Sequence, residues 1–239
     1  MDTSLSVEEQ AIAERIQELK QQLGDDLLVL GHHYQRDSIV MHADFLGDSF
    51  MLSQKAAASN AKYIVFCGVH FMAESADILT SDDQSVVLPN LRAGCSMADM
   101  ATLSEVEVAW EELLRESGLS DPINRPNPEA PAGENEAFLV PVTYMNSSAD
   151  LKDFVGRHGG VVCTSSNAEG VLTWAFERAG PGGAVLFFPD QHLGRNTGLA
   201  MGIDAERMPT WTPGVGAMGS LENARIVLSV SYTHLTLPT

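Results

Sequence analysis

The sequence predicts an α/β protein built from repeated three-layer αβα domains with parallel sheets. Short, continuous apolar runs such as YIVFC, residues 63–67, are typical of strands buried on both faces of a parallel sheet. Segments with helical spacing of apolar residues alternate with these runs along most of the chain. Glycine or polar residues follow directly after most runs, as they do where a parallel strand passes into a loop.

The first half of the chain is expected to open with a surface helix. Ser6 and Glu9 have the spacing of a capping box, and four apolar residues recur on one stripe after them. The stripe consists of Ile12, Ile16, Leu19 and Leu23. Strands are then expected at residues 27–31, 63–69 and 86–89, and helices at residues 43–59, 71–79 and 104–117.

A loop at residues 118–136 separates this half from the next, because it holds four prolines and shows no apolar period. Beyond it the alternation returns, with strands expected at residues 138–144, 160–163 and 184–188 and helices at residues 150–154 and 167–179. The predicted domains are therefore residues 1–117, with the N-terminal helix, and residues 137–229, which form an incomplete second domain.

The two halves contain a weak internal repeat. CGVHFMAESADIL, followed by VVLPNLRAG, resembles CTSSNAEGVLTWAF, followed by VLFFPDQHLG. Both run from a strand through a cysteine, a turn and a helix to a strand and a proline, so that Pro89 and Pro189 stand at matching points. Two related domains are expected to face each other across a cleft, which is the natural place for a binding site.

The last residues differ from the rest. SYTHLTLPT, residues 231–239, continues no helix or strand pattern and has the character of a translated sequencing adapter. Residues 230–239 are therefore predicted to be a non-native tail. A genuine short β segment is the other interpretation.

The composition limits the possible functions. The formal net charge at pH 7 is −18, with 14 basic and 32 acidic residues, and this argues against nucleic acid as a partner. The sequence contains no run of 18 apolar residues, so no membrane span is predicted. Its first residues lack the features of a signal peptide. Three cysteines, an odd count without an export signal, favour a reducing, cytoplasmic location.

The first polar cluster is GHHYQ, residues 31–35, at the carboxyl end of the first strand. Alternation along an extended segment puts His32 and Tyr34 on one side and His33 on the other. An imidazole beside a phenol can bind an anion and transfer protons. Simple packing under a loop is an equally open interpretation.

Three further polar clusters follow strands or turns. GDSF contains Ser49, which could hold a carboxylate or serve an ordinary turn. TYMNSS alternates Tyr144 and Asn146 onto one face, unless it is an Asx turn. TSSNA, residues 164–168, has the hydroxyls and N–H groups of an anion-binding helix N-terminus, although plain capping by Ser166 or Asn167 is the favoured interpretation of this segment by itself.

The cysteines differ in their surroundings. Cys67 and Cys163 follow apolar runs and are expected to be buried in strands. Cys95 follows a glycine in a polar loop and is the better candidate for a metal ligand. One cysteine makes no metal site, and the chain has neither a CxxC pair nor a ferredoxin-type run.

These segments together resemble the quinolinate synthase family. GHHYQ, ADFLGDS, IVFCGVHFMAESADIL, AGCSMAD, YMNSSADLK, CTSSNA and FFPDQHLGRN occur in the family's order and at compatible spacings. The resemblance covers about residues 27–196. No single segment is specific for the family, but the whole set of segments in this order is.

The resemblance implies an enzyme of NAD biosynthesis. Family members have three similar α/β domains around a pseudo-threefold axis, each giving one cysteine to a central [4Fe–4S] cluster. One iron stays open and acts as a Lewis acid. The reaction condenses iminosuccinate with dihydroxyacetone phosphate to give quinolinate, phosphate and water. An L-aspartate oxidase or dehydrogenase that supplies iminosuccinate is the implied functional partner.

The resemblance also assigns roles to residues. Cys95 matches the first cluster ligand, and its sulfur is expected to point toward His32, Tyr144 and Ser165. Tyr34 matches a proposed acid/base residue, and Tyr144 is a second catalytic candidate. The substrate-binding positions are matched by His32, Ser49, Tyr144, Met145, Asn146 and Ser165.

The chain departs from the family where a Gly-His-Cys-x-Val-His segment should follow ENARIVL. The second and third cluster cysteines are therefore missing, and the chain is expected to be an inactive amino-terminal fragment. Two alternatives are a cluster-free α/β module that binds a small anion and an enzyme with zinc or iron on His32 and His33. The second is disfavoured because adjacent strand residues point to opposite faces.

Overall fold

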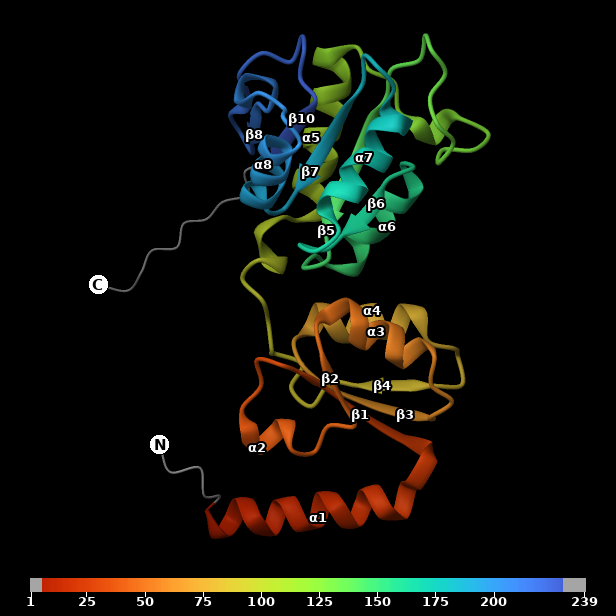
Figure 1. Ribbon diagram of the computed structural model, residues 1–239, viewed down its shortest axis with the longest axis vertical. Coiled ribbons are helices and arrows are strands. Elements are labelled where there is room, and N and C mark those ends of the chain that lie inside the picture. The colour runs from red at the N-terminus through yellow and green to blue at the C-terminus, as the bar shows by residue number, and fades with distance from the viewer. Residues whose placement is uncertain (1–5, 230–239) are drawn as a thin grey trace, which may run out of the picture. The chain divides into compact units, whose positions relative to one another are not determined.

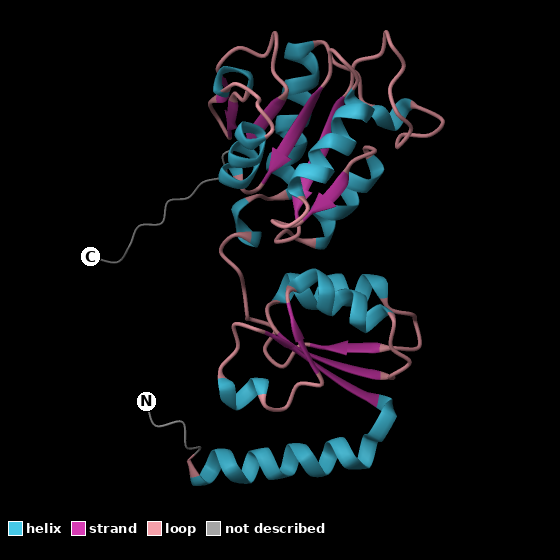
Figure 2. Ribbon diagram, in the orientation of Figure 1, coloured by secondary structure: helices cyan, strands magenta, loops and turns pink. Residues whose placement is uncertain are grey.

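The computed structural model describes residues 6–229. The chain divides into two compact units, Met1–Cys95 and Ser96–Thr239. Each unit is a parallel or mostly parallel sheet flanked by helices, as Figures 1 and 2 show, so the predicted α/β class is confirmed. No helix within residues 6–229 is long and apolar enough to cross a membrane.

The first unit is built around a four-stranded parallel sheet with strand order β2-β1-β3-β4. Its elements are α1 (Val7–Leu23), η1 (Gly24–Asp26), β1 (Leu27–His32), α2 (Asp37–Val40), β2 (Phe45–Gly47), α3 (Ser49–Ala57), β3 (Tyr63–Cys67), α4 (His70–Leu79) and β4 (Ser85–Val87).

Helices α3 and α4 cover one face of this sheet. Leu30, Ile64 and Phe66 alternate onto that face and are fully buried. Helix α1 lies on the opposite side of the sheet (Figure 1). Ser6 caps α1 in the predicted capping box with Glu9, but α1 buries none of its residues.

The second unit contains a six-stranded sheet with strand order β6-β5-β7-β10-β8-β9, in which only β9 runs antiparallel to its neighbour. Its elements are η2 (Ala98–Met100), α5 (Leu103–Ser117), η3 (Pro122–Asn124), β5 (Leu139–Tyr144), α6 (Ala149–Arg157), β6 (Val161–Cys163), α7 (Ala168–Ala179), β7 (Ala184–Phe188), α8 (Gln191–Ala200), η4 (Ala205–Arg207), β8 (Thr210–Thr212), β9 (Gly216–Met218) and β10 (Ile226–Ser229).

Helices cover both faces of this second sheet. On one face, Trp110 of α5 and Phe154 of α6 pack in a core with Leu186. On the other, Leu172 of α7 packs in a separate core with Phe187 of β7. The second unit is therefore a complete three-layer αβα sandwich.

The unit boundary differs from the predicted domain boundary. The loop at residues 118–136 was expected to separate the domains, which would put α5 in the first one. In the structure α5 belongs to the second unit, because Trp110 and Leu113 lie in the core of the second sheet and Trp211 Nε1 donates a 2.8 Å hydrogen bond to Glu112 Oε2.

The predicted repeat exists, but its correspondence is different. The order β2-β1-β3-β4 is repeated by β6-β5-β7-β10, so β6 corresponds to β2 and β7 to β3. The sequence comparison instead matched the strand of Cys67, β3, with the strand of Cys163, β6. Pro189 follows β7 and therefore matches the position after β3, where Gly68 stands, and not Pro89.

Several predicted elements have different limits. Residues 43–59 do not form one helix, because residues 45–47 pair with β1 as strand β2 and only Ser49–Ala57 is helical. Helix α8 and the pair β8–β9 were not predicted. The predicted non-native tail, residues 230–239, lies outside the described residues.

Candidate functional site

In the first unit the candidate residues gather where β1 and β2 end. His32, the last residue of β1, pairs with Gly47, the last residue of β2. The backbone N–H of His33 donates to Gly47 O at 3.2 Å, and His33 Nδ1 lies 3.0 Å from the same oxygen. The histidine segment and the Gly-Asp-Ser turn are thus joined at the carboxyl edge of the sheet, where α/β proteins bind ligands.

The rings of His32, His33 and Tyr34 form one aromatic cluster. The ring centroids of His32 and His33 are 4.5 Å apart and nearly parallel, and Tyr34 meets each ring edge-on at 4.8 and 4.4 Å. The prediction that His33 points away from His32 was therefore wrong. Strict alternation holds only within a strand, and β1 ends at His32.

His32 and Tyr34 differ greatly in exposure. His32 is 7% exposed, whereas Tyr34 is 83% exposed. Burial and the neighbouring His33 lower the pKa of His32, and Asp48 opposes them only in part. The Tyr34 backbone N–H points at His32 Nδ1 at 3.4 Å. The lowered pKa favours the neutral imidazole near pH 7, and the Tyr34 N–H aimed at Nδ1 favours the tautomer with its proton on Nε2.

Ser49 is the first residue of α3. Asp48 caps this helix by accepting a 2.8 Å hydrogen bond from the Met51 N–H. The Ser49 side chain is half-buried, two residues beyond the end of β2. The structure thus brings Ser49 to the same sheet edge as His32.

Cys95 lies in the loop between β4 and η2. The His70 N–H, at the start of α4, donates a 2.8 Å hydrogen bond to Ala93 O in this loop. Because α4 begins directly after β3, this bond brings the loop of Cys95 to the carboxyl edge of the first sheet. Cys95 is half-buried there. Its predicted approach to Tyr144 and Ser165 stays a prediction.

The second unit has a corresponding edge. Tyr144, the last residue of β5, pairs with Cys163, the last residue of β6. The Met145 N–H donates a 2.8 Å hydrogen bond to Cys163 O, and the Met145 side chain is buried. Met145 therefore supports the loop, while Tyr144 and Asn146 are half-buried beside it. The Lys152 ammonium donates to Ser147 O at 2.8 Å and fixes the rest of the loop.

The N-terminus of α7 lies at this edge. Neither Ser166 nor Asn167 caps the helix with its side chain, so the predicted capping role of these residues was wrong. Asn167 Oδ1 instead accepts a 2.7 Å hydrogen bond from the Thr164 N–H, and the hydroxyls of Thr164 and Ser166 lie 3.0 Å apart. The exposed Ser165 stands between them.

Sequence reasoning missed two supporting residues. His33 anchors the β1 loop to Gly47, as described above, and Asp190 caps α8 by accepting hydrogen bonds from the N–H groups of His192 at 2.9 Å and Leu193 at 3.0 Å. Aspartate directly before a helix is a usual capping signal, and FFPDQHLGRN contains it. No comparable local signal marks His33.

The three cysteine thiols differ in burial. Cys163 is fully buried, and burial raises its pKa to about 12. Cys67 is half-buried, not buried as predicted, and desolvation raises its pKa as well. Among residues 6–229 no group of three or more Cys, His, Asp or Glu side chains is placed to hold a metal ion.

The fold is that of an α/β protein with polar residues at the carboxyl edge of each parallel sheet, where proteins of this class bind ligands. Parallel sheets end in loops that carry imidazole, phenol and hydroxyl groups, and α7 directs an N-terminus without a side-chain cap at one of them. Comparison with known proteins identifies the family. Residues 14–228 match the family model described as quinolinate synthetase A protein, and the chain belongs to the quinolinate synthase family.

Curated relatives agree with this family. Quinolinate synthase of Corynebacterium glutamicum is 56% identical over 219 residues, which cover 90% of this chain and 50% of the relative. The Rhodopirellula baltica enzyme is 48% identical over 239 residues, covering 93% of this chain and 56% of the relative. The Geobacillus kaustophilus enzyme is 49% identical over 209 residues, which cover 87% of this chain and 51% of the relative. The chain thus spans about half the length of the curated relatives it matches.

Proposed function

We propose that this chain is the amino-terminal half of a quinolinate synthase that condenses iminosuccinate with dihydroxyacetone phosphate, releasing phosphate and water. The family match supports the proposal, and one structural observation carries it: each unit presents an exposed or half-buried hydroxyl, Ser49 or Ser165, beside an aromatic residue at a strand end. An L-aspartate oxidase or dehydrogenase would supply iminosuccinate, which is an oxidised form of aspartate.

Ser165 and the first turn of α7 would bind a carboxylate or phosphate of the substrates. The twelve-residue helix has N-terminal N–H groups that no side chain caps, and the helix dipole favours an anion there. The Thr164 and Ser166 hydroxyls bond to each other and hold the turn in shape. Ser165 supplies a further donor. Tyr144 and Asn146 would orient the substrate from the neighbouring strand end.

His32 and Tyr34 would act together in the first unit. Because its pKa is lowered, His32 is a neutral hydrogen-bond donor through Nε2 near pH 7 and not a fixed positive charge. Tyr34 is exposed at the edge of the aromatic cluster and can exchange a proton with a bound substrate. Together with Tyr144, Tyr34 is the proposed acid/base residue, and Ser49 is the proposed partner for a substrate carboxylate.

The residues of this chain do not by themselves fit a [4Fe–4S] cluster. Cys95 is the one cysteine in a loop, while Cys163 is buried and protonated and Cys67 lies on a sheet face with a raised pKa. In the proposed full-length enzyme Cys95 gives one thiolate, and two cysteines come from the half that has no counterpart here. When bound, the cluster would supply a Lewis-acidic iron.

Anaerobic reconstitution tests whether this chain supplies only one of the three cluster ligands. The 239-residue chain and the complete C. glutamicum enzyme are treated with iron and sulfide, desalted and analysed for both elements. The complete enzyme should retain a stoichiometric cluster and form quinolinate, and this chain should do neither. A stoichiometric cluster on this chain would refute the proposal that it supplies a single ligand.

The proposed hydrogen bond from Ser165 to a substrate is tested in the complete C. glutamicum enzyme. Alanine at the residue aligned with Ser165 should raise KM by about 10- to 100-fold, the range of a hydrogen bond to a charged group. Alanine at the residue aligned with Ser220 is the control, because Ser220 is exposed in the loop before β10, at the other edge of the sheet. Equal KM values for both variants contradict the assigned role.

A further inference from the structure

The chain turns sharply where β1 ends. The Gln35 N–H donates a 2.9 Å hydrogen bond to His32 O, which closes a four-residue turn with His33 and Tyr34 at its centre. The turn ends the alternation of side chains that holds within the strand. The ring of His33 therefore lies against the ring of His32 instead of on the opposite side of the sheet.

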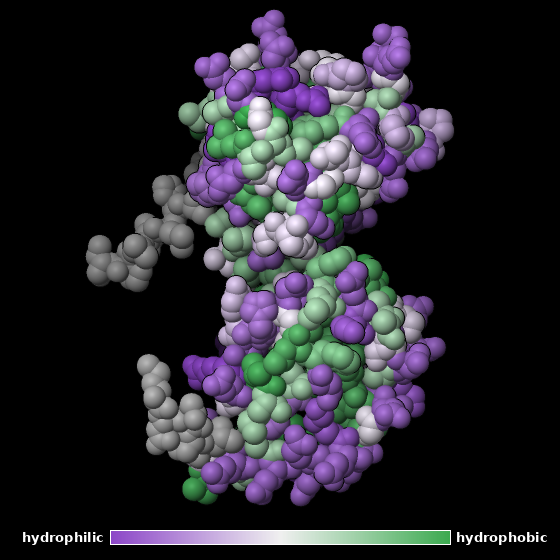
Figure 3. All heavy atoms as spheres, in the orientation of Figure 1, coloured by the Kyte–Doolittle hydropathy of each residue, from purple (hydrophilic) through white to green (hydrophobic). Residues whose placement is uncertain are grey.

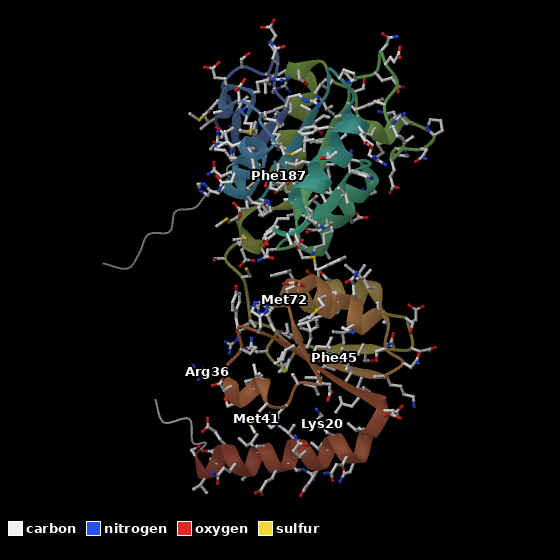
Figure 4. The ribbon with its side chains drawn as sticks, in the orientation of Figure 1. Lys20, Arg36, Met41, Phe45, Met72 and Phe187 are labelled. Carbon is white, nitrogen blue, oxygen red and sulfur yellow. The ribbon has the colours of Figure 1, made fainter. Side chains whose placement is uncertain are left out.

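The neighbouring strand β2 gains little from the burial of its side chains. It pairs with β1 over three residues, and the side chains of Phe45 and Leu46 are 44% and 46% exposed. Apolar spheres are visible on the surface of the first unit in Figure 3, and Phe45 is labelled in Figure 4. Hydrogen bonds at the end of β2 therefore contribute more to fixing the Gly-Asp-Ser turn, residues 47–49, that follows it.

His33 supplies two such hydrogen bonds. Its backbone N–H donates to Gly47 O at 3.2 Å, and its ring Nδ1 lies 3.0 Å from the same oxygen. A carbonyl oxygen accepts only and has two lone pairs, so Nδ1 carries a proton and both bonds form together. The His33 side chain thus joins the Gly-Asp-Ser turn to the end of β1.

The same ring covers His32. The two ring centroids are 4.5 Å apart, and the ring planes are inclined by 26°. His33 is exposed whereas His32 is 7% exposed, so the outer ring shields the inner one from solvent. Stacked rings attract each other, and the Tyr34 N–H faces His32 Nδ1 at 3.4 Å. The His32 imidazole is therefore held both by stacking and by a hydrogen bond.

We propose that His33 is a positioning residue, which holds the His32 imidazole and the Gly-Asp-Ser turn with Ser49 in one arrangement. Its ring contacts both parts, since Nδ1 bonds to the turn and the ring face lies against His32. His33 needs no contact with a substrate for this role. That the arrangement serves substrate binding rests on the function proposed above, whereas the positioning itself does not.

NMR of the histidine side chains in the 239-residue chain tests the hydrogen bond. At a pH where the imidazoles are neutral, ¹⁵N shifts should show His33 with its proton on Nδ1 and His32 with its proton on Nε2. His192, which is exposed in the second unit, provides the shifts of a ring in contact with solvent. A proton on Nε2 of neutral His33 overturns the proposal, because Nδ1 would then have nothing to donate.

Two variants of this chain test the stack through the pKa of His32. Burial and the charge of His33 lower that pKa. His33→Asn removes the covering ring and should raise the pKa of His32, whereas His33→Phe keeps a ring there and should raise it less. Asp48, which raises the pKa of His32, is the same in both variants. An unchanged pKa of His32 in both variants overturns the proposal.

Enzyme assays test whether the positioning serves substrate binding. In the complete C. glutamicum enzyme, the residue aligned with His33 is set in turn to histidine, phenylalanine and alanine. Alanine should raise KM by about 2- to 10-fold over histidine, the range of one neutral hydrogen bond. Phenylalanine should give an intermediate KM, because it keeps the stack without the donor. A protein that is only less stable would lose active enzyme, which lowers the apparent kcat and leaves KM unchanged.

Failure of the positioning role and failure of the proposed function give different results. If the histidine form makes quinolinate and alanine leaves KM unchanged, the positioning role is overturned and the proposed function stands. If no form makes quinolinate, the proposed function fails, and the NMR results alone decide whether His33 positions His32.

Discussion

Ser49 and Ser165 occupy the same place in two sheets of identical strand order. Each lies two residues beyond the end of the equivalent strand, β2 or β6, and that strand end pairs with an aromatic residue, His32 or Tyr144. The repeat thus places one hydroxyl and one aromatic side chain at each carboxyl edge. The two edges are therefore variants of one arrangement, with an imidazole in the first unit and a phenol in the second.

Two glycines near α6 should respond in opposite ways to alanine. A Cβ at Gly160 would lie 1.9 Å from Pro141 O in the neighbouring strand, whereas a Cβ at Gly156, inside α6, meets nothing within 4 Å. Gly160→Ala should lower the free energy of unfolding by about 1–3 kcal/mol through overpacking. Gly156→Ala should raise it by about 0.5–1 kcal/mol, because glycine disfavours the helix interior. Urea unfolding measures both, and equal midpoints for the two variants contradict the geometry.

Asp121 should make the second unit sensitive to acid. Its Oδ2 lies 2.7 Å from His158 Nδ1 and accepts a 2.9 Å hydrogen bond from Trp110 Nε1. Burial raises the pKa of Asp121, but the hydrogen bonds from His158, the Ile123 N–H and Trp110 outweigh it and lower that pKa below 3.8. The ionised carboxylate therefore stabilises the fold above pH 3.8, and this stabilisation is lost as the pH falls through the folded-state pKa.

The Asp121→Asn variant tests this contribution. It should cost about 1.5–3 kcal/mol at pH 7, the value of hydrogen bonds to a charged group, and the difference from the parent should shrink below pH 3.8. The control is Asp153→Asn, because Asp153 forms an exposed pair with Arg157 on α6 that contributes about 0.3–0.5 kcal/mol. Urea unfolding at several pH values gives both numbers. A constant difference at all pH values would show that the charge on Asp121 is not the cause.

Local patterns predicted some elements well. The capping box of α1 and all five residues of β7 follow from neighbours in the chain, since caps and apolar runs are local features. Strand β2 was missed because residues 45–47 become a strand only by pairing with β1.

The candidate site was predicted in part. Chain order alone places His32, Ser49, Tyr144 and Ser165 at or just after the ends of strands. Parallel strands share one carboxyl edge, so their grouping within each unit was predictable. The direction of the His33 side chain was not predictable, because β1 ends one residue before it, at His32. The bare N-terminus of α7 was not predicted either, since the Asn167 side chain turns back to the Thr164 N–H.

The three cysteines should react with iodoacetamide at very different rates. With a pKa of about 12, Cys163 has a thiolate fraction on the order of 10⁻⁴ at pH 8, and it is fully buried as well. Cys67 should be slow because desolvation raises its pKa, and Cys95 should react first. Peptide mass spectrometry after timed labelling measures the order. In urea the three rates should converge, and native labelling of Cys163 ahead of Cys95 would contradict the burial described here.

Matched substitutions in two buried leucines should locate the unit boundary. Leu113 of α5 packs in the core of the second sheet, and Leu52 of α3 is fully buried in the first unit. Each change to alanine should cost about 2–5 kcal/mol in its own unit. Hydrogen exchange then separates the units: Leu113→Ala should speed exchange in β5 and β7 and leave β1 and β3 unchanged, while Leu52→Ala should do the reverse. If Leu113→Ala instead speeds exchange in β1 and β3, α5 belongs with the first unit, and the loop at residues 118–136 is the boundary after all.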